Sequence, residues 1–376
     1  MPALALNWEC LRRAAHFTLR RASRFVVAEL DQPHVVLSTS VRNGGQSAGI
    51  RYLANHQSCE GSAHKERYDE INAHGGQEAY HGVVCAEMDL PASEVALMGT
   101  AANMNYAAVV TAQDLGVEAT AVVTAGVQGN ACCAGDPAAW REGEKGWEKV
   151  GGTINTMVLI NWPLTAGAMA RAAITMTEAK SAALQRLAVR SLYSQEFATG
   201  TGTDQYAIAA LADGSAPLTS TSPHVKLGEL IGCAVRDATL EALRWQNGLE
   251  ASYTRSVFSA LGRFGLREET FFTDIAPFLS EVDLELLKKN SKSVVYEPLV
   301  SASAYAMAAV LDRARHGVIP PGAAREALRH QAASMAASLA AKPHLWDVFR
   351  AQLDETDAAQ LALHAIAIGW SAKWRS

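Results

Sequence analysis

A glycine-rich turn at residues 197–205, FATGTGTDQ, carries the densest group of side chains that could do chemistry. Besides its glycines it holds Thr199, Thr201, Thr203 and Asp204. The hydroxyls could attack or bind a substrate, the carboxylate could accept a proton, and the glycines allow close approach of the backbone to a ligand. The segment lacks the third glycine of a dinucleotide fingerprint and the Gly-Lys-Ser/Thr of a P-loop. By itself it fits a tight turn before a strand as well as it fits a site.

A second group begins at Ser222, in the sequence SPHVKLGELIG. Ser222 is a favourable N-cap and Pro223 a favourable first helical residue, so we expect a helix to start here. His224 would lie in its first turn, beside unpaired backbone N–H groups that favour negative charge. Lys226 and Glu229 are three residues apart and would face the same side, where they could serve a site or simply pair with each other.

A third group spans residues 152–187, where GTINTMVLIN precedes a long amphipathic segment. The first part has the apolar content of a strand and contains Thr153 and Asn155. In the second part, helical spacing places Thr177 and Lys180 on one face. These four side chains are therefore further candidates for a site at the junction of a strand and a helix.

Two asparagines next to glycines, Asn43 and Asn130, follow expected strands. Asparagine in this setting usually forms a turn, but its amide could also hold an oxyanion or a substrate amide. No metal-binding helix motif and no nucleophile elbow occurs in the sequence. The histidines at 56–81 lack tight ligand spacing, so we expect no metal.

Short apolar runs that alternate with helical patterns predict the α/β fold that positions these residues. The expected strands cover 34–41, 94–100, 119–127, 153–161 and 205–212, and the expected helices cover 103–115, 165–187 and 223–244. Residues 55–81 are rich in histidine and poor in apolar residues, which predicts a loop insertion. After about residue 250 the Ala- and Leu-rich sequence predicts helices. We therefore expect two domains, 1–250 with a layered mixed sheet and helices, and 251–376 as an all-α C-terminal extension.

Composition excludes several classes of protein. The net charge of -5 over 376 residues provides no basic field for nucleic acid, and no apolar run is long enough to span a membrane. The six cysteines show no C-x-x-C spacing, which predicts reduced thiols and, with the absence of a cleavable apolar leader, a cytoplasmic protein.

Seven blocks in one order resemble the adenosylcobinamide amidohydrolase (CbiZ) family. They are LSTSVRNGG (37–45), MGTAANM (98–104), VTAGVQGNACCAGD (123–136), GTINTMVLIN (152–161), TEAKSAALQ (177–185), ATGTGTD (198–204) and HVKLGELIG (224–232). The resemblance covers roughly residues 28–245. The sequence departs from the family pattern at Pro223 and Val225, where the family has threonines around the histidine, and the helical extension lies outside the resemblance.

The resemblance implies hydrolysis of the amide that joins (R)-1-amino-2-propanol to the adenosylated corrin ring, which gives adenosylcobyric acid in corrinoid salvage. Residues 1–250 would form the amidohydrolase domain, and the role of residues 251–376 stays unassigned. The partner would be a small-molecule corrinoid, whose cobalt enters as substrate and not as a built-in cofactor. A homo-oligomer is left open. The fold would be α/β, and the stretch from GTINT to GTGTD is distantly similar to the αββα sandwich of the aminopeptidase/ornithine acetyltransferase superfamily.

Within this framework the candidate residues receive roles. Asp204 or Glu229 would be the base, His224 the proton shuttle, and Lys226 with Asn155 would bind the oxyanion or the amide. The remaining candidates would line the substrate site: Asn43, Asn130, Thr153, Thr177, Lys180, Thr199, Thr201 and Thr203. A threonine nucleophile at 153, 199 or 201 is the rival to attack by water. Both require the glycine–threonine turn and the helix start after Ser222 to meet around one amide. A phosphotransferase using the 200–204 turn and a non-catalytic corrinoid-binding protein are the alternative functions.

Overall fold

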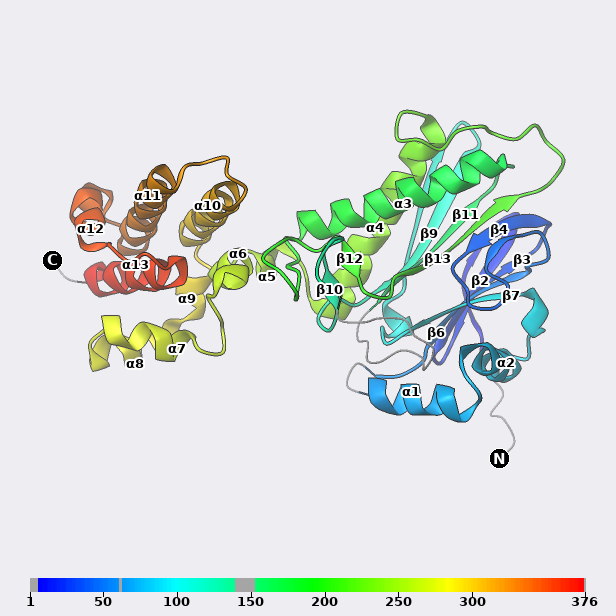
Figure 1. Ribbon diagram of the computed structural model, residues 1–376, viewed down its shortest axis with the longest axis horizontal. Coiled ribbons are helices and arrows are strands. Elements are labelled where there is room, and N and C mark those ends of the chain that lie inside the picture. The colour runs from blue at the N-terminus through cyan, green and yellow to red at the C-terminus, as the bar shows by residue number, and fades with distance from the viewer. Residues whose placement is uncertain (1–5, 61–62, 139–152, 375–376) are drawn as a thin grey trace. The chain divides into compact units, whose positions relative to one another are not determined.

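The computed structural model describes residues 6–60, 63–138 and 153–374, which divide into two compact units, Met1–Leu249 and Glu250–Ser376. The first unit contains mixed sheets and helices, and the second is helical (Figure 1). The fold is therefore α/β with an all-α C-terminal extension, as the sequence predicted.

Two main sheets build the first unit. The first sheet has the strand order β1 (Glu9–Arg13), β2 (Phe17–Ala22), β3 (Phe25–Leu30), β6 (Tyr52–Gln57) and β7 (Val95–Thr100). The second has the order β5 (Gly45–Ser47), β4 (His34–Ser38), β13 (Gln205–Leu211), β11 (Ile154–Ile160), β9 (Val117–Ala125) and β8 (Ala108–Asp114). Strand β11 runs parallel to β13 and antiparallel to β9, so β11 and β13 begin at one edge of the second sheet and end at the other. Asp204 directly precedes β13, so we call the edge at which β11 and β13 begin the Asp204 edge. The edge at which they end is the opposite edge.

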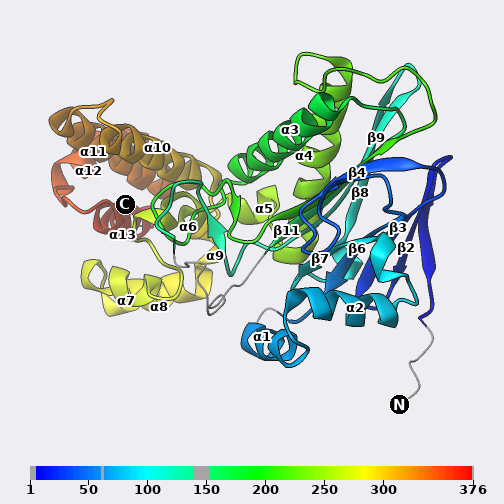
Figure 2. The ribbon, with the colours of Figure 1, turned by 45° about the vertical axis from the view of Figure 1, so that its right-hand side comes forward.

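Strand alternation sorts side chains into layers. On the face of the second sheet that meets the first sheet, Met157 and Leu159 of β11 pack into one buried cluster. On its other face, Ile154 and Val158 pack against α3 (Ala166–Arg186) and α4 (Lys226–Asn247). The first sheet is covered on its outer side by α2 (Gln77–Glu87). Figures 1 and 2 show this helix–sheet–sheet–helix order, which confirms the αββα sandwich.

Helix α3 begins as predicted, because Thr165 Oγ1 accepts a hydrogen bond from the Ala168 backbone N–H at 3.2 Å. Helix α4 begins later than predicted, at Lys226, and Val225 occupies the N-cap without a side-chain cap. Gly228 allows the preceding chain to pack against the first turn of α4, because a Cβ there would lie 1.9 Å from the Ser222 carbonyl oxygen. The chain before α4 folds back against the helix, so Ser222 cannot cap it and His224 lies before the helix.

Two further predictions were wrong. Residues 103–115 form the short turn η2 (Met104–Tyr106) and strand β8 instead of a helix, because β8 pairs with β9 through a hairpin whose turn residues Leu115 and Gly116 both have positive φ. Residues 55–81 are not a loop insertion. They contain the end of β6, α1 (His64–Ala73) and the start of α2, and His56 and His81 are buried in this packing.

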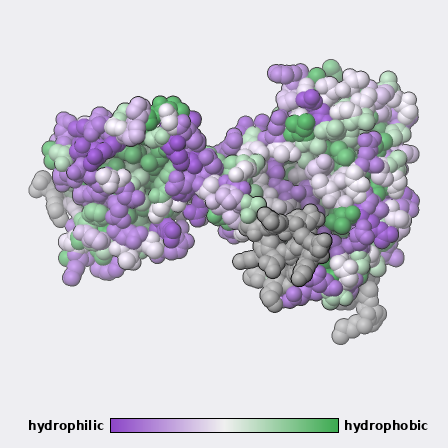
Figure 3. All heavy atoms as spheres, viewed as in Figure 1, coloured by the Kyte–Doolittle hydropathy of each residue, from purple (hydrophilic) through white to green (hydrophobic). Residues whose placement is uncertain are grey.

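The second unit is a set of helices around an Ala- and Leu-rich core. They are α5 (Ala251–Thr254), α6 (Val257–Leu261), α7 (Phe271–Ile275), α8 (Glu281–Asn290), α9 (Lys292–Val295), α10 (Pro298–Arg315), α11 (Pro321–Ala340), α12 (Trp346–Gln352) and α13 (Ala358–Lys373). Arg263 and Asp312 form a short ion pair in this unit, and apolar side chains reach its surface between hydrophilic ones (Figure 3). Across the described ranges of both units, no helix combines the length and apolarity needed to cross a bilayer.

Candidate active site

Asp204, directly before β13, is the centre of a hydrogen-bond network at the edge named after it. Its Oδ2 forms a short ion pair with Lys180 Nζ from α3, and its Oδ1 accepts from Thr201 Oγ1 at 2.5 Å. The backbone N–H groups of Thr201 and Ile154 donate to the same carboxylate at 3.1 and 3.0 Å. Four donors occupy the roughly four acceptor sites of a carboxylate, so Asp204 holds a hydroxyl and an ammonium in fixed positions.

The glycines of the turn permit this close packing. A Cβ on Gly200 would lie 2.4 Å from Asp204 Oδ2 and 2.8 Å from Lys180 Nζ, and a Cβ on Gly202 would lie 2.7 Å from Asn130 Nδ2. Gly200 also pairs with Cys132 between the short strands β12 (Gly200–Thr201) and β10 (Ala131–Cys132). The turn continues into a strand, whereas phosphate-binding loops lead into a helix N-terminus. Its glycines therefore serve the Asp204 network.

A pocket of about 170 Å³ opens beside Asp204, on the helix side of the second sheet. We call it the Asp204 pocket; it is lined by Thr39, Ile154, Thr156, Met176, Thr177, Lys180, Asp204, Gln205 and Tyr206. A cavity of this size has room for several waters. It can hold one flexible side arm of a ligand.

Period-two alternation puts the strand residues of this pocket on one wall. Asp204 and Tyr206 share a face of the β13 segment, and Thr156 of β11 lies opposite Tyr206 in the parallel register. Thr156 and Tyr206 were missed by the sequence-based reasoning. Thr156 could have been predicted from its position next to Asn155. Because consecutive strand residues face opposite sides of a sheet, only one of the two can face the helices.

Most of the predicted threonines and Asn130 lie around Asp204. Thr153 Oγ1 donates to the Thr203 carbonyl at 2.7 Å, and Thr199 Oγ1 accepts from the Ala134 N–H at 2.8 Å. Asn130 Oδ1 accepts from the Tyr193 hydroxyl at 2.9 Å. The structure brings together Asn130, Thr153, Thr177, Lys180, Thr199, Thr201, Thr203 and Asp204.

Asn155 and Asn43 lie elsewhere. Asn155 is fully buried between the two sheets, where its Nδ2 donates to Asn55 Oδ1 at 2.9 Å and to the Gly99 carbonyl at 3.1 Å. Alternation turns it away from the Asp204 pocket, so the structure does not place it with the other candidates. Asn43 has φ 61° and donates to the carbonyls of Ala92 and Val95, which makes it a turn residue.

His224, Lys226 and Glu229 lie at the opposite edge. The other end of α4 reaches the Asp204 edge, because Asn247 Oδ1 accepts from the N–H of Val127, just after β9. With 22 residues, α4 is about 33 Å long and places its first turn far from Asp204. The predicted convergence around one amide is therefore wrong, and the reason is that α4 crosses the whole sheet.

The first turn of α4 carries a surface ion pair. Lys226 Nζ and Glu229 Oε2 are 2.7 Å apart, and their side chains are 51% and 54% exposed. This hydrogen bond raises the pKa of Lys226, with a smaller contribution from Asp114, the last residue of β8. The interaction with Asp114 is consistent with the position of the α4 start at the opposite edge.

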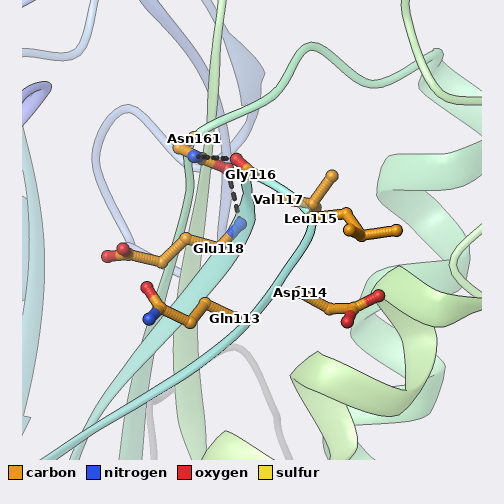
Figure 4. Close-up of a pocket in the computed structure, with 7 residues that line it drawn as sticks. All are labelled: Gln113, Asp114, Leu115, Gly116, Val117, Glu118 and Asn161. Carbon is orange, nitrogen blue, oxygen red and sulfur yellow. Dashed lines mark hydrogen bonds between the residues drawn. The ribbon is translucent and has the colours of Figure 1, made fainter.

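A second concavity, of about 380 Å³, lies at the opposite edge around the β8–β9 turn (Figure 4). Asn161 holds this turn, because it accepts from the Glu118 N–H at 2.7 Å and donates to the Gly116 carbonyl at 2.9 Å. The lining residues are Gln113, Asp114, Leu115, Gly116, Val117, Glu118 and Asn161. They include no hydroxyl, thiol, histidine or lysine, and their ionisable side chains are the carboxylates of Asp114 and Glu118.

The thiols of Cys132 and Cys133 lie near the Asp204 network. Within the described ranges, no three His, Cys, Asp or Glu side chains form a group that could hold a metal ion. Burial, followed by the Asp204 charge, raises the pKa of the Cys132 thiol, and burial raises that of Cys133. Both thiols therefore stay protonated at neutral pH and are poor nucleophiles.

The fold and the site define an αββα sandwich protein with a hydroxyl, a carboxylate and an ammonium held together at strand ends. The family model for adenosylcobinamide amidohydrolase (CbiZ) matches residues 9–251, and the chain belongs to this family of hydrolases. An uncharacterized protein of Methanocaldococcus jannaschii is 32% identical over 240 residues, which cover 61% of this chain and 89% of that relative. Residues after 251 lie outside the family match.

Proposed function

We propose that this protein hydrolyses the amide between the aminopropanol arm and the corrin ring of adenosylcobinamide, and that the reaction occurs at the Asp204 pocket. Membership of the amidohydrolase family supports the reaction and the corrinoid substrate. The location is supported by one observation: the Asp204 carboxylate is bonded to both Thr201 Oγ1 and Lys180 Nζ. The products would be adenosylcobyric acid and 1-amino-2-propanol, and the cobalt would enter with the substrate.

This arrangement supports a covalent route through an ester on Thr201. Thr201 Oγ1 would attack the carbonyl carbon while its proton passes to Asp204 Oδ1, to which it is already hydrogen bonded. Lys180 Nζ would stabilise the oxyanion that forms. As the C–N bond breaks, the proton moves from Asp204 to the departing nitrogen. Water then cleaves the ester, which releases the carboxylic acid and restores the threonine.

Attack by water is the alternative mechanism at the same carboxylate. Because Asp204 already accepts from four donors, a water would have to replace one of them before giving up its proton. The two routes differ in one observable property, which is whether the protein carries the acyl group during turnover.

The proposal is tested by incubating the protein with adenosylcobinamide and measuring both products by mass spectrometry. We expect release of aminopropanol together with adenosylcobyric acid, and a fall of at least about 100-fold in kcat/KM for Thr201→Val. Thr120→Val, a buried strand threonine nearer the opposite edge, is the matched control and should keep its activity. An acyl adduct in rapidly quenched wild-type protein supports the ester, whereas full activity of Thr201→Val supports attack by water.

Two other outcomes would identify the alternative functions. A non-catalytic corrinoid-binding protein would bind adenosylcobinamide without releasing aminopropanol. A phosphotransferase would be stabilised against heat by nucleotides, a function less supported because the 200–204 turn leads into β13.

A further inference from the structure

Thr156 is a buried hydroxyl residue on the wall of the Asp204 pocket. It is 2% exposed, and within the described part of the chain its hydroxyl has no hydrogen-bond partner. Neighbouring buried threonines are bonded, since Thr153 donates to the Thr203 carbonyl and Thr124 accepts from Asn55. A buried hydroxyl that borders a cavity without a protein partner is placed to bond whatever enters the cavity.

Tyr206 provides a second polar group beside Thr156. The two residues are direct neighbours in the β11–β13 pairing and share the pocket wall. The backbone of Tyr206 is fixed by Thr39, because Tyr206 N donates to Thr39 Oγ1 at 2.9 Å and Thr39 N donates to the Tyr206 carbonyl at 3.0 Å. Its half-buried side chain also lines the pocket, as does Met176 of α3.

The spacing along β13 matches the scissile arm. Asp204 and Tyr206 are two residues apart, which corresponds to about 6.6 Å along the strand. In an N-(2-hydroxypropyl) amide, four bonds separate the carbonyl carbon from the alcohol oxygen, a reach of about 5 Å when extended. A carbonyl at Thr201 and Asp204 would therefore place the alcohol at the level of Tyr206 and Thr156.

From this geometry we infer that Thr156 and Tyr206 bind the alcohol of the departing amine and make the pocket selective for hydroxylated secondary amides. The inference rests on the proposed hydrolysis at Asp204. It names the feature by which the protein would distinguish the aminopropanol arm from the other arms of the ring, which end in primary amides without an alcohol.

The experiment compares adenosylcobinamide with an analogue whose arm ends in an N-propyl amide and so lacks only the hydroxyl. Wild-type protein should prefer the hydroxylated arm by at least about 100-fold in kcat/KM, since the analogue offers Thr156 no alcohol to bond. Thr156→Val should reduce this preference to less than about 10-fold, mainly by slowing cleavage of the natural arm. Tyr206→Phe should reduce it by a smaller factor.

Two controls separate recognition from folding. Thr156→Ser keeps the hydroxyl and should restore the preference, and Thr120→Val removes a buried strand hydroxyl distant from the pocket and should leave it unchanged. Equal cleavage of both compounds by the wild type, or an unchanged preference in folded Thr156→Val, would overturn the inference while leaving the proposed hydrolysis in place. Cleavage of neither compound would overturn both.

Discussion

The two edges of the second sheet carry similar side chains in different settings. At the Asp204 edge, a carboxylate, a lysine and a hydroxyl are partly buried and bonded to one another beside a pocket. At the opposite edge, Lys226 and Glu229 form an exposed pair at the start of α4. Both groups stood out in the sequence with comparable strength. The two edges therefore differ in how far these polar groups are buried and in whether they share one acceptor.

Replacing Lys180 with methionine should produce a large difference between the edges. It removes the cation beside Asp204 and the developing oxyanion, so we expect kcat/KM to fall by about 100- to 1,000-fold. Steady-state assays of aminopropanol release measure this change. A loss below 10-fold in a folded Lys180→Met protein would mean that the ion pair serves only structure.

Substitution of Gly200 by alanine tests the same edge through its backbone. The new Cβ would overlap Asp204 Oδ2 and Lys180 Nζ, so these groups must move and we expect kcat/KM to fall by at least about 10-fold. Gly232→Ala on α4 is the matched control, because a Cβ there meets nothing within 4 Å. Equal activity of the two variants would show that the close approach at Gly200 is not needed.

Acid should reduce the stability of the fold, an effect that we expect to be smaller than the losses of activity above. Histidines at both edges should contribute to it. Burial lowers the pKa of His56, next to the Asp204 edge, to about 3, and burial with His34 lowers that of His16, at the opposite edge, to about 4. Unfolded histidine binds a proton below pH 6.5, so the stability from these neutral side chains is complete above pH 6.5 and is lost as the pH falls toward 3–4.

His56→Phe removes one of these groups and keeps a ring to stack on Phe25, whose centroid is 4.9 Å away. Urea unfolding at pH 7.5 and pH 5 should show a smaller loss of stability on acidification in this variant than in the wild type. His224→Phe, at an exposed position, is the control and should retain the wild-type loss. An identical pH dependence in all three proteins would contradict the assignment of His56.

The smallest effect is expected for Lys226→Met at the opposite edge. Exposed ion pairs contribute little to stability, so the melting temperature should stay within experimental error of the wild type. The value of kcat/KM should stay within about twofold. A loss of activity as large as that of Lys180→Met would reverse the assignment of the two edges.

The sequence predicted the layers of the fold and one side of the site. The apolar content of 153–161 and the amphipathic segment after it made β11 and α3 predictable, and the glycine–threonine turn was found from its composition. The helix predicted at 103–115 was wrong because its Ala- and Val-rich run fits both the helical and the strand periodicity. Pairing with β9 stabilises the strand. The position of the α4 start failed because the edge at which a helix begins depends on the path of the whole chain, which local patterns do not contain.

The most direct test compares the two carboxylates that the sequence offered as the base. Asp204→Asn and Glu229→Gln, each checked for folding, are given adenosylcobinamide and the rate of aminopropanol release is measured beside the wild type. We predict a loss of at least about 1,000-fold for Asp204→Asn and wild-type turnover for Glu229→Gln. Wild-type turnover by Asp204→Asn, with loss in Glu229→Gln, would contradict the placement of the reaction at the Asp204 edge.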